Sequence, residues 1–259
     1  MCNSDGVKHP SRRQSSWKHF AGRLNFNTRR GETKSSGTNS TFSRCWRPLS
    51  GALGCCIIVC SGFVFAAGVP DKTIRLFDSE SFPKKWVFHS AERKSKLEET
   101  WKVRKAEKVE DSVLICTGKP LGYIRTVAPY SNYEYRMQWK YPKDANGNSG
   151  VLIHASQDKK DDRIWPRSIQ VQLHQPVAGS IFPVGGALTD NKFDSKDLKL
   201  PVDTWHDCLI VCKDGTVTVS INGKKLGTVT GCLPNTGCIA LQSEGSEVHF
   251  RRITLKPLK

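Results

Sequence analysis

From residue 73 onward, apolar and polar positions alternate in short runs that are separated by turn residues. A period of two predicts half-buried strands, because successive side chains of a strand point to opposite faces. The runs that fit this pattern are 112–116, 122–127, 133–140, 150–155, 168–174, 205–213, 216–222, 238–243 and 247–255. No window of ten or more residues shows a helical stripe, and 91–99 is too charged for more than one exposed turn. The pattern therefore predicts an all-β protein.

Turn signals between the runs indicate how they connect. Asp214-Gly215 and Asn222-Gly223 each separate two runs, and glycine tolerates the positive φ that a tight hairpin turn requires. Many strands and little helix over about 190 residues indicate a jelly-roll β-sandwich of two antiparallel sheets.

Composition agrees with this fold class. The 259 residues include 2 methionines, 21 glycines and 13 prolines, which is typical of a turn-rich β protein and not of a helical bundle. Hydrophobic residues make up 37% and charged residues 25%, which excludes a multi-span membrane protein and a wholly disordered chain.

The N-terminal quarter has the features of an export signal. Ten basic and two acidic side chains lie in residues 1–66, so half of the net charge of +16 is there. Residues 1–50 lack apolar periodicity, which predicts a disordered basic region, and 51–67 is an uncharged apolar segment that ends in small residues. We expect cleavage near Ala66, with an uncleaved membrane anchor as the alternative.

This interpretation predicts where the mature protein is located and which binding partners it has. The mature domain is expected at 68–259, in the periplasm or outside the cell. A basic tail beside an export segment is a targeting feature, so we expect no nucleic-acid partner. Membrane contact is expected only through the signal segment, if it is not cleaved.

Five of the ten cysteines remain in the predicted mature chain. Cys208 and Cys212 are four positions apart in one strand, roughly 13 Å, which is too far to bridge. Cys232 and Cys238 flank a turn, and the sequence leaves open whether they form a disulfide or stay buried thiols. No Cys or His spacing fits zinc, and no metal or cofactor is predicted.

Two runs have outward positions that are rich in hydrogen-bonding groups. In 133–140 the inward set is Tyr133, Tyr135, Met137 and Trp139, and the outward set is Glu134, Arg136, Gln138 and Lys140. In 168–174 the inward set is Ile169, Val171 and Leu173, and the outward set is Ser168, Gln170, Gln172 and His174. If these strands and the run ending near His154 are neighbours, one sheet face presents a carboxylate, a guanidinium, amides and imidazoles.

Such a face has two interpretations. It is either the solvated side of a half-buried sheet, as antiparallel sheets usually have, or a ligand face. Gln, His and Arg beside Trp139 and Trp165 suit hydrogen bonding and stacking with sugars.

Three stretches, 148–154, 164–173 and 241–253, together resemble the 3-keto-disaccharide hydrolase family, and the resemblance extends from about Ile74 to Leu258. It implies an exported concanavalin A-like sandwich whose concave sheet binds sugar. Members with known activity cleave glycosides that are already oxidised to the ketone at C3. That carbonyl acidifies the C2 hydrogen, so a base can remove it, the C1 aglycone leaves, and water then adds. The expected partner is therefore an oxidised (3-keto) oligosaccharide or glycoside.

The resemblance also suggests roles for individual residues. Gln170 stands where the family pattern usually has Glu, and an amide cannot take a proton. The candidates for the base are His154, His174 and Glu134, with His154 ranked first because it follows the shared Asn-Ser-Gly stretch. Arg136 is expected to stabilise the enolate. The expected substrate contacts are Gln172, His174, Asn148, Trp165 and Gln138.

A non-catalytic carbohydrate-binding module is the alternative that Gln170 favours. A retaining glucanase needs paired carboxylates along one strand, and the outward positions of 168–174 offer none. The acidic residues Asp158, Asp161 and Asp162 lie in a mixed-charge loop that is expected to be solvated, and their spacing fits no EF-hand calcium loop.

Overall fold

The computed structural model describes residues 72–157 and 164–259. The predicted basic region 1–50, the apolar segment 51–67 and the loop carrying Asp158, Asp161 and Asp162 lie outside the described residues. Within the described ranges, no helix is long and apolar enough to span a membrane.

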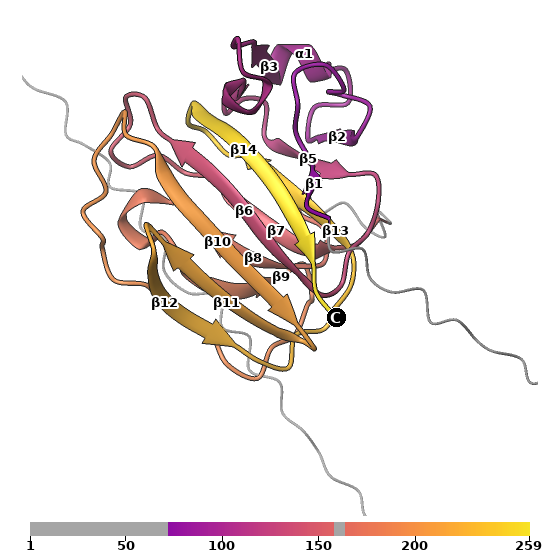
Figure 1. Cartoon of the computed structure of the whole chain (residues 1–259), viewed down its shortest axis with the longest axis vertical. Helices are drawn as coiled ribbons and strands as arrows, with labels where there is room; N and C mark the ends of the chain where they lie inside the picture. The colour runs from indigo at the N-terminus through magenta and orange to yellow at the C-terminus, as the bar shows by residue number, and fades with distance from the viewer. Residues whose placement is uncertain (1–71, 158–163) are drawn as a thin grey trace, which may run out of the picture. The chain divides into compact units, whose positions relative to one another are not determined.

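The described chain forms two antiparallel sheets, which confirms the predicted fold class (Figure 1). The eight-stranded sheet has the order β12-β11-β10-β6-β14-β4-β3, with β1 also paired to β14. Its strands are β1 (Ile74–Arg75), β3 (Trp101–Arg104), β4 (Val113–Cys116), β6 (Tyr133–Lys140), β10 (His206–Lys213), β11 (Thr216–Ile221), β12 (Lys224–Val229) and β14 (Val248–Pro257).

The six-stranded sheet has the order β2-β5-β13-β7-β8-β9. Its strands are β2 (Trp86–Ser90), β5 (Gly122–Thr126), β7 (Gly150–Ala155), β8 (Ser168–Gln172), β9 (Ile181–Val184) and β13 (Cys238–Ser243). The helical elements of the described ranges are short: α1 (Leu97–Thr100), η1 (Val109–Asp111) and η2 (Gln175–Val177).

All nine predicted runs contain a strand of the structure. The strands that the pattern missed are β1, β2, β3, β9 and β12, and the last four lie at the ends of the two sheets. Edge strands carry more charge and tolerate proline, as Pro183 in β9 and Lys224-Lys225 in β12 illustrate. Their alternation is correspondingly weak. Both predicted hairpin turns are present, with positive φ at Asp214-Gly215 and Asn222-Gly223.

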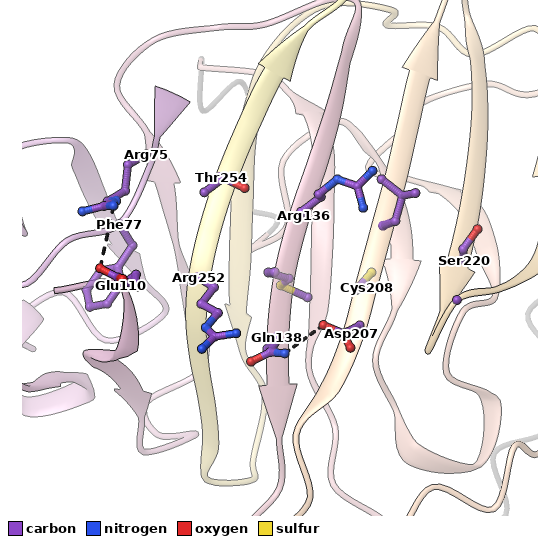
Figure 2. A pocket seen from close by; sticks show the side chains of 13 residues that line it. Arg75, Phe77, Glu110, Arg136, Gln138, Asp207, Cys208, Ser220, Arg252 and Thr254 are labelled. Carbon is purple, nitrogen blue, oxygen red and sulfur yellow. Dashed lines mark hydrogen bonds and ion pairs between the residues drawn. The ribbon is translucent and has the colours of Figure 1, made fainter. Parts of the chain in front are cut away.

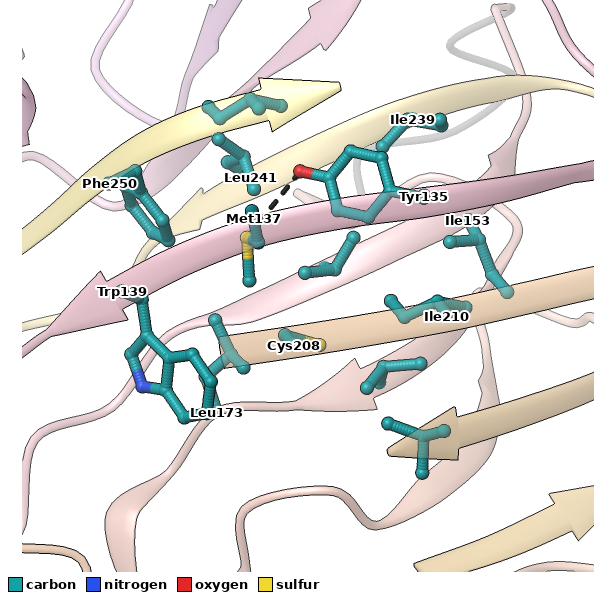
Figure 3. Close-up of a cluster of buried hydrophobic side chains, with 14 of the residues drawn as sticks. Tyr135, Met137, Trp139, Ile153, Leu173, Cys208, Ile210, Ile239, Leu241 and Phe250 are labelled. Atoms are coloured by element: carbon teal, nitrogen blue, oxygen red, sulfur yellow. Dashed lines mark hydrogen bonds between the residues drawn. The ribbon is translucent and has the colours of Figure 1, made fainter. Parts of the chain in front are cut away.

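The main core lies between the sheets and contains the predicted inward side chains (Figure 3). Tyr135, Met137 and Trp139 of β6 are at most 2% exposed and pack with residues such as Leu241 and Phe250. Burial of such large side chains supplies most of the stabilisation, and truncating one of them to alanine costs about 3–5 kcal/mol.

The cysteines of the described ranges are buried free thiols, including Cys232 and Cys238. The sequence left open whether Cys232 and Cys238 form a disulfide or stay buried thiols, and in the structure they are buried thiols. Burial raises the pKa of Cys208 to about 12 and that of Cys232 to about 11, so these thiols stay protonated at neutral pH.

Candidate functional site

The two polar runs of the sequence lie in different sheets. β6 pairs with β10 and β14 in the eight-stranded sheet, whereas β7 and β8 pair with each other in the six-stranded sheet. The strand with Arg136 is therefore not a neighbour of the strands with His154 and Gln170, and the single polar face that the sequence suggested does not form. Glu134, Arg136 and Gln138 face away from the core on one side of the sandwich, and Gln170 and Gln172 do so on the other.

Arg136 and Gln138 line a groove of about 700 Å³ on the eight-stranded sheet, here called the Arg136 groove (Figure 2). Its lining residues include Arg75, Glu110, Arg136, Gln138, Asp207, Leu209, Ser220, Arg252 and Thr254.

The polar side chains in and around this groove satisfy one another. Arg136 Nη2 lies 3.0 Å from Glu134 Oε2, and Gln138 donates to Asp207 Oδ1 over 2.8 Å. Gln138 also accepts a 2.7 Å hydrogen bond from Arg251. Arg136 is 58% exposed, so its ion pair is well solvated. These contacts are typical of the solvent-exposed surface of a sheet. Arg136 and Glu134 lie in the other sheet from Gln170 and are not near it.

His154 occupies a buried position at a β-bulge. The pairing of β7 with β13 shifts register between Cys238 and Ala240, and His154 has a φ of 53°. Its Nε2 lies 3.1 Å from Ser131 O, and its ring meets the Tyr133 ring edge-on at 5.7 Å. Burial lowers the pKa of His154, which keeps the imidazole neutral.

The ring of His154 packs against Tyr133 of the main core and its Nε2 bonds to a backbone carbonyl, so the side chain is directed into the molecule and out of reach of a substrate. The bulge explains this position, because it changes the alternation after Ile153. The expected role of His154 as the base does not fit the structure.

The remaining predicted residues lie around the six-stranded sheet. Trp165 precedes β8 and approaches Tyr123 with ring centroids 6.4 Å apart. Asn148 precedes β7; its backbone N–H donates to Ser246 Oγ over 3.2 Å, and its Oδ1 is buried without a described partner. His174 follows β8 at the start of η2.

The outer surface of the six-stranded sheet brings together side chains from four strands. Arg125, Ala240, Leu152 and Gln170 follow one another across β5, β13, β7 and β8. In the adjacent row, Tyr123 is opposite Gln242, and Gly150 is opposite Gln172. We call this surface the Gln170 face and define it by Tyr123, Arg125, Gln170, Gln172 and Gln242.

A separate apolar cluster confirms that this surface faces away from the main core. It consists of Tyr123, Leu152, Ala155, Cys238 and Ala240, with Trp165 packed against it. His89 of β2 extends the aromatic surface, since its ring stacks on Tyr123 with centroids 4.7 Å apart.

The amides of Gln170 and Gln242 form the centre of the face. Gln242 Nε2 donates to Gln170 Oε1 over 3.4 Å, although the two residues are only 1% and 5% exposed, respectively. Gly150 leaves room for them, because a Cβ at this position would lie 2.2 Å from Gln242 Oε1.

Two polar atoms of the face, Gln242 Oε1 and Arg125 Nε, lack a described partner. Asn148 Oδ1, two residues before Gly150 in the chain, lacks one as well. A buried polar group without a partner costs about 1–3 kcal/mol, so natural proteins rarely retain one without a use. Amide, guanidinium and aromatic groups are those that bind sugar hydroxyls and sugar rings, and the face is therefore a candidate carbohydrate site.

The sequence interpretation missed Tyr123, Arg125, His89 and Gln242. Two signals were present. Tyr123 and Arg125 alternate in the run 122–127, and Gln242 lies within one of the stretches that carry the family resemblance. Among the described residues, no group of three or more His, Cys, Asp or Glu side chains is placed to hold a metal ion.

Comparisons with known proteins identify the family and the fold. Residues 72–256 match the model of the family described as a 3-keto-alpha-glucoside-1,2-lyase-like domain. A protein from Parabacteroides distasonis described as a glycosyl hydrolase is 21% identical, with a TM-score of 0.54 over 72% of this chain and 100% of that chain. A Bacillus subtilis protein with a galectin-like fold is 12% identical, with a TM-score of 0.50 over 72% of this chain and 94% of that chain.

At these identities the two structures show a shared fold. No curated protein matches the chain. The family match covers most of the chain, including the three stretches quoted above and the strands of the Gln170 face. The chain belongs to the 3-keto-alpha-glucoside-1,2-lyase-like family.

Proposed function

We propose that this chain is an exported carbohydrate-active enzyme that cleaves 3-keto-glycosides by elimination of the aglycone and hydration of the product. The observation that supports this most is the Gln170 face, where buried amide and guanidinium atoms without partners lie beside the aromatic rings of Tyr123 and Trp165. Family membership supports the reaction class.

The face offers groups for the parts of this reaction other than the base. The ketone at C3 takes up negative charge when C2 loses its proton, and a fixed donor at that oxygen lowers the barrier. Arg125 is the arginine of this face; its Nη1 donates to Thr126 O over 3.1 Å, and we assign its Nε, which has no described partner, to such an oxygen. Arg125 therefore takes the role that the sequence suggested for Arg136.

The remaining groups suit recognition of the sugar. Gln170 and Gln242 offer amide donors and acceptors to hydroxyl groups, and Trp165 and Tyr123 offer rings against which a sugar can stack.

A turnover assay tests the proposal. The protein is incubated with a 3-keto-disaccharide and, separately, with the parent disaccharide. We expect release of the aglycone sugar from the ketone and none from the parent, because the C2 hydrogen of the parent is not acidic. Absence of turnover of the ketone, with and without added divalent metal ions, contradicts the proposed reaction.

Gln170 favours a second candidate, a non-catalytic carbohydrate-binding module. Its amide lies at the centre of the face and cannot accept a proton from carbon. This alternative predicts saturable binding of sugar, measured by calorimetry, with no bond cleavage of either the ketone or the parent.

Export is part of the proposal and rests on residues 51–67. Sequencing the N-terminus of the native protein tests it. A start near Ala67 or Gly68 supports a cleaved signal, and a start within residues 1–50 contradicts cleavage and favours the anchored alternative.

A further inference from the structure

The row of side chains across the Gln170 face continues onto β9, the strand beside β8 at the end of the six-stranded sheet. Phe182 is directly opposite Gln170, and Ile181 is opposite Val171. Because Ile181 and Val171 belong to the main core, the alternation along β9 directs Phe182 outward, on the same side as Gln170.

Phe182 is a half-buried ring outside the apolar clusters of the protein. Among the described residues, Phe193 is one of the partly buried side chains that pack against the main core, whereas Phe182 packs against neither cluster. Val184, which is opposite Ser168, is a second half-buried apolar side chain on this side of β9. β9 therefore presents an aromatic ring and an aliphatic side chain next to the amide of Gln170.

The two ends of the Gln170 face differ in how their polar atoms are used. Toward β5 and β13, Arg125 Nε and Gln242 Oε1 have no described partner. Toward β9, Gln172 Oε1 accepts two backbone N–H groups over 2.9 and 3.0 Å. Ser180 Oγ donates to a backbone carbonyl over 2.8 Å and accepts a backbone N–H over 2.9 Å. The hydroxyl groups of a ligand therefore find partners on the β13 side, and the β9 side suits a ring without hydroxyl groups.

The strand spacing fits a sugar with one ring attached to it. Neighbouring strands lie about 4.8 Å apart, so Phe182 is one strand spacing beyond Gln170. A sugar that hydrogen-bonds to Gln170 and Gln242 can thus place its C1 substituent over β9. On the other side of the amide pair, Tyr123 and Trp165 are the rings against which the sugar itself stacks.

We propose, on the basis of the proposed function, that the preferred ligands are glycosides of phenols, whose sugar contacts Gln170 and Gln242 and whose aromatic aglycone stacks on Phe182. An aromatic ring leaves no hydroxyl group unpaired on this apolar surface, and ring stacking adds stability beyond the area that is buried. In the proposed reaction the C2–H and C1–O bonds break and water adds across the C1–C2 double bond. One 3-keto-glycoside and one water therefore give one 3-keto sugar and one phenol.

The aglycone dependence of a Phe182 variant tests this proposal. The wild type and Phe182→Ala are compared on the phenyl and methyl 3-ketoglucosides of the same anomeric form. We measure kcat/KM where a compound is cleaved and Kd by calorimetry where it is only bound. Phe182→Ala should weaken the phenyl glycoside by about 3- to 10-fold, the range of one aromatic stacking contact, and leave the methyl glycoside within about twofold. Comparing each variant with the wild type on the same compound removes the difference between the two leaving groups.

Leu209→Ala is the matched control. Leu209 is also a half-buried apolar side chain at an outward position, but it lies on β10 of the other sheet. It should leave both glycosides at wild-type values. A phenyl-to-methyl ratio that changes less than about twofold in Phe182→Ala, or changes equally in Leu209→Ala, overturns the assignment of Phe182.

The outcomes separate this proposal from the proposed function. Binding that depends on Phe182 without cleavage of any 3-keto-glycoside contradicts the reaction and supports the aglycone site. Cleavage with an unchanged phenyl-to-methyl ratio supports the reaction and overturns the aglycone site. An equal loss on a 3-keto-disaccharide shows that the site takes a second sugar, which overturns the phenol class. Absence of both binding and cleavage overturns both proposals.

A second variant covers the case in which Phe182→Ala does not fold. Phe182→Leu keeps an apolar side chain on β9 and removes only the ring. It should still lower the phenyl-to-methyl ratio by at least about twofold, and an unchanged ratio overturns the assignment.

Discussion

The outer surfaces of the two sheets look alike in sequence and differ in structure. In the Arg136 groove, the polar side chains are exposed and paired with one another, as in the Arg136–Glu134 ion pair. On the Gln170 face, Gln170 and Gln242 are buried and Arg125 and Gln172 are half-buried, and two polar atoms, Gln242 Oε1 and Arg125 Nε, have no described partner. The difference shows that the polarity of a sheet surface does not identify a ligand site. The informative feature is the combination of unpartnered polar atoms with a buried amide pair and an aromatic cluster, since unpartnered atoms alone also occur in the core, at Trp139 Nε1 and Tyr133 Oη.

The largest expected effect comes from replacing each of the two arginines of this comparison by alanine, in separate variants. Arg125→Ala should lower kcat/KM for a 3-keto-disaccharide by about 100- to 1,000-fold, the usual range for loss of an oxyanion donor. Arg136→Ala removes the same side chain from the opposite sheet and should leave kcat/KM within about twofold of the wild type, because its ion pair is solvated. A large loss in Arg136→Ala with none in Arg125→Ala would place the active site in the groove.

A smaller effect is expected from filling the space above Gly150. The Cβ of Gly150→Ala would lie 2.2 Å from Gln242 Oε1 and 3.0 Å from Gln170 Nε2, so the two amides must move apart. We expect sugar affinity to fall about tenfold, a loss of about 1.4 kcal/mol, measured by calorimetry. Unchanged affinity would show that the Gln170–Gln242 pair does not contact the sugar.

The smallest effect concerns His154 and tests its structural role. Burial lowers the pKa of His154 in the folded state, so the unfolded chain binds a proton more readily below about pH 6.5. Stability should therefore fall as the pH drops from 7 through the unfolded pKa to the folded pKa, by at most about 1.4 kcal/mol per pH unit from this group. His206 and His249, whose pKa values are also lowered by burial, add to this slope.

Denaturant unfolding at pH 7 and pH 5.5 measures this contribution. His154→Gln should reduce the pH dependence and leave turnover at pH 7 within a few-fold, once corrected for the fraction of folded protein. Loss of turnover in a folded His154→Gln protein would return His154 to the catalytic candidates.

The sequence predicted the central strands and their inward side chains, because both depend on local alternation. The β6 set Tyr133, Tyr135, Met137 and Trp139 is buried as expected. Edge strands such as β9 and β12 were missed because edge positions are less constrained by packing.

The site was less predictable, because it depends on which strands are partners. Alternation along β6 and along β8 shows which residues face outward, but it does not show that the two strands lie in different sheets. The bulge at His154 likewise arises from the pairing of β7 with β13, and no property of residues 150–155 alone reveals it. Alternation placed Gln170 at an outward position, as in the structure, but neither the alternation nor the family resemblance identified Arg125 or Gln242 as its neighbours.

A crystal structure of the protein with a bound 3-keto-disaccharide, or with a slowly reacting analogue of it, tests the central claim most directly. We predict density for the sugar on the Gln170 face, with hydroxyl groups within hydrogen-bond distance of Gln170 and Gln242 and the C3 oxygen beside Arg125. Density for the sugar in the Arg136 groove, beside Arg136 and Asp207, would contradict the account.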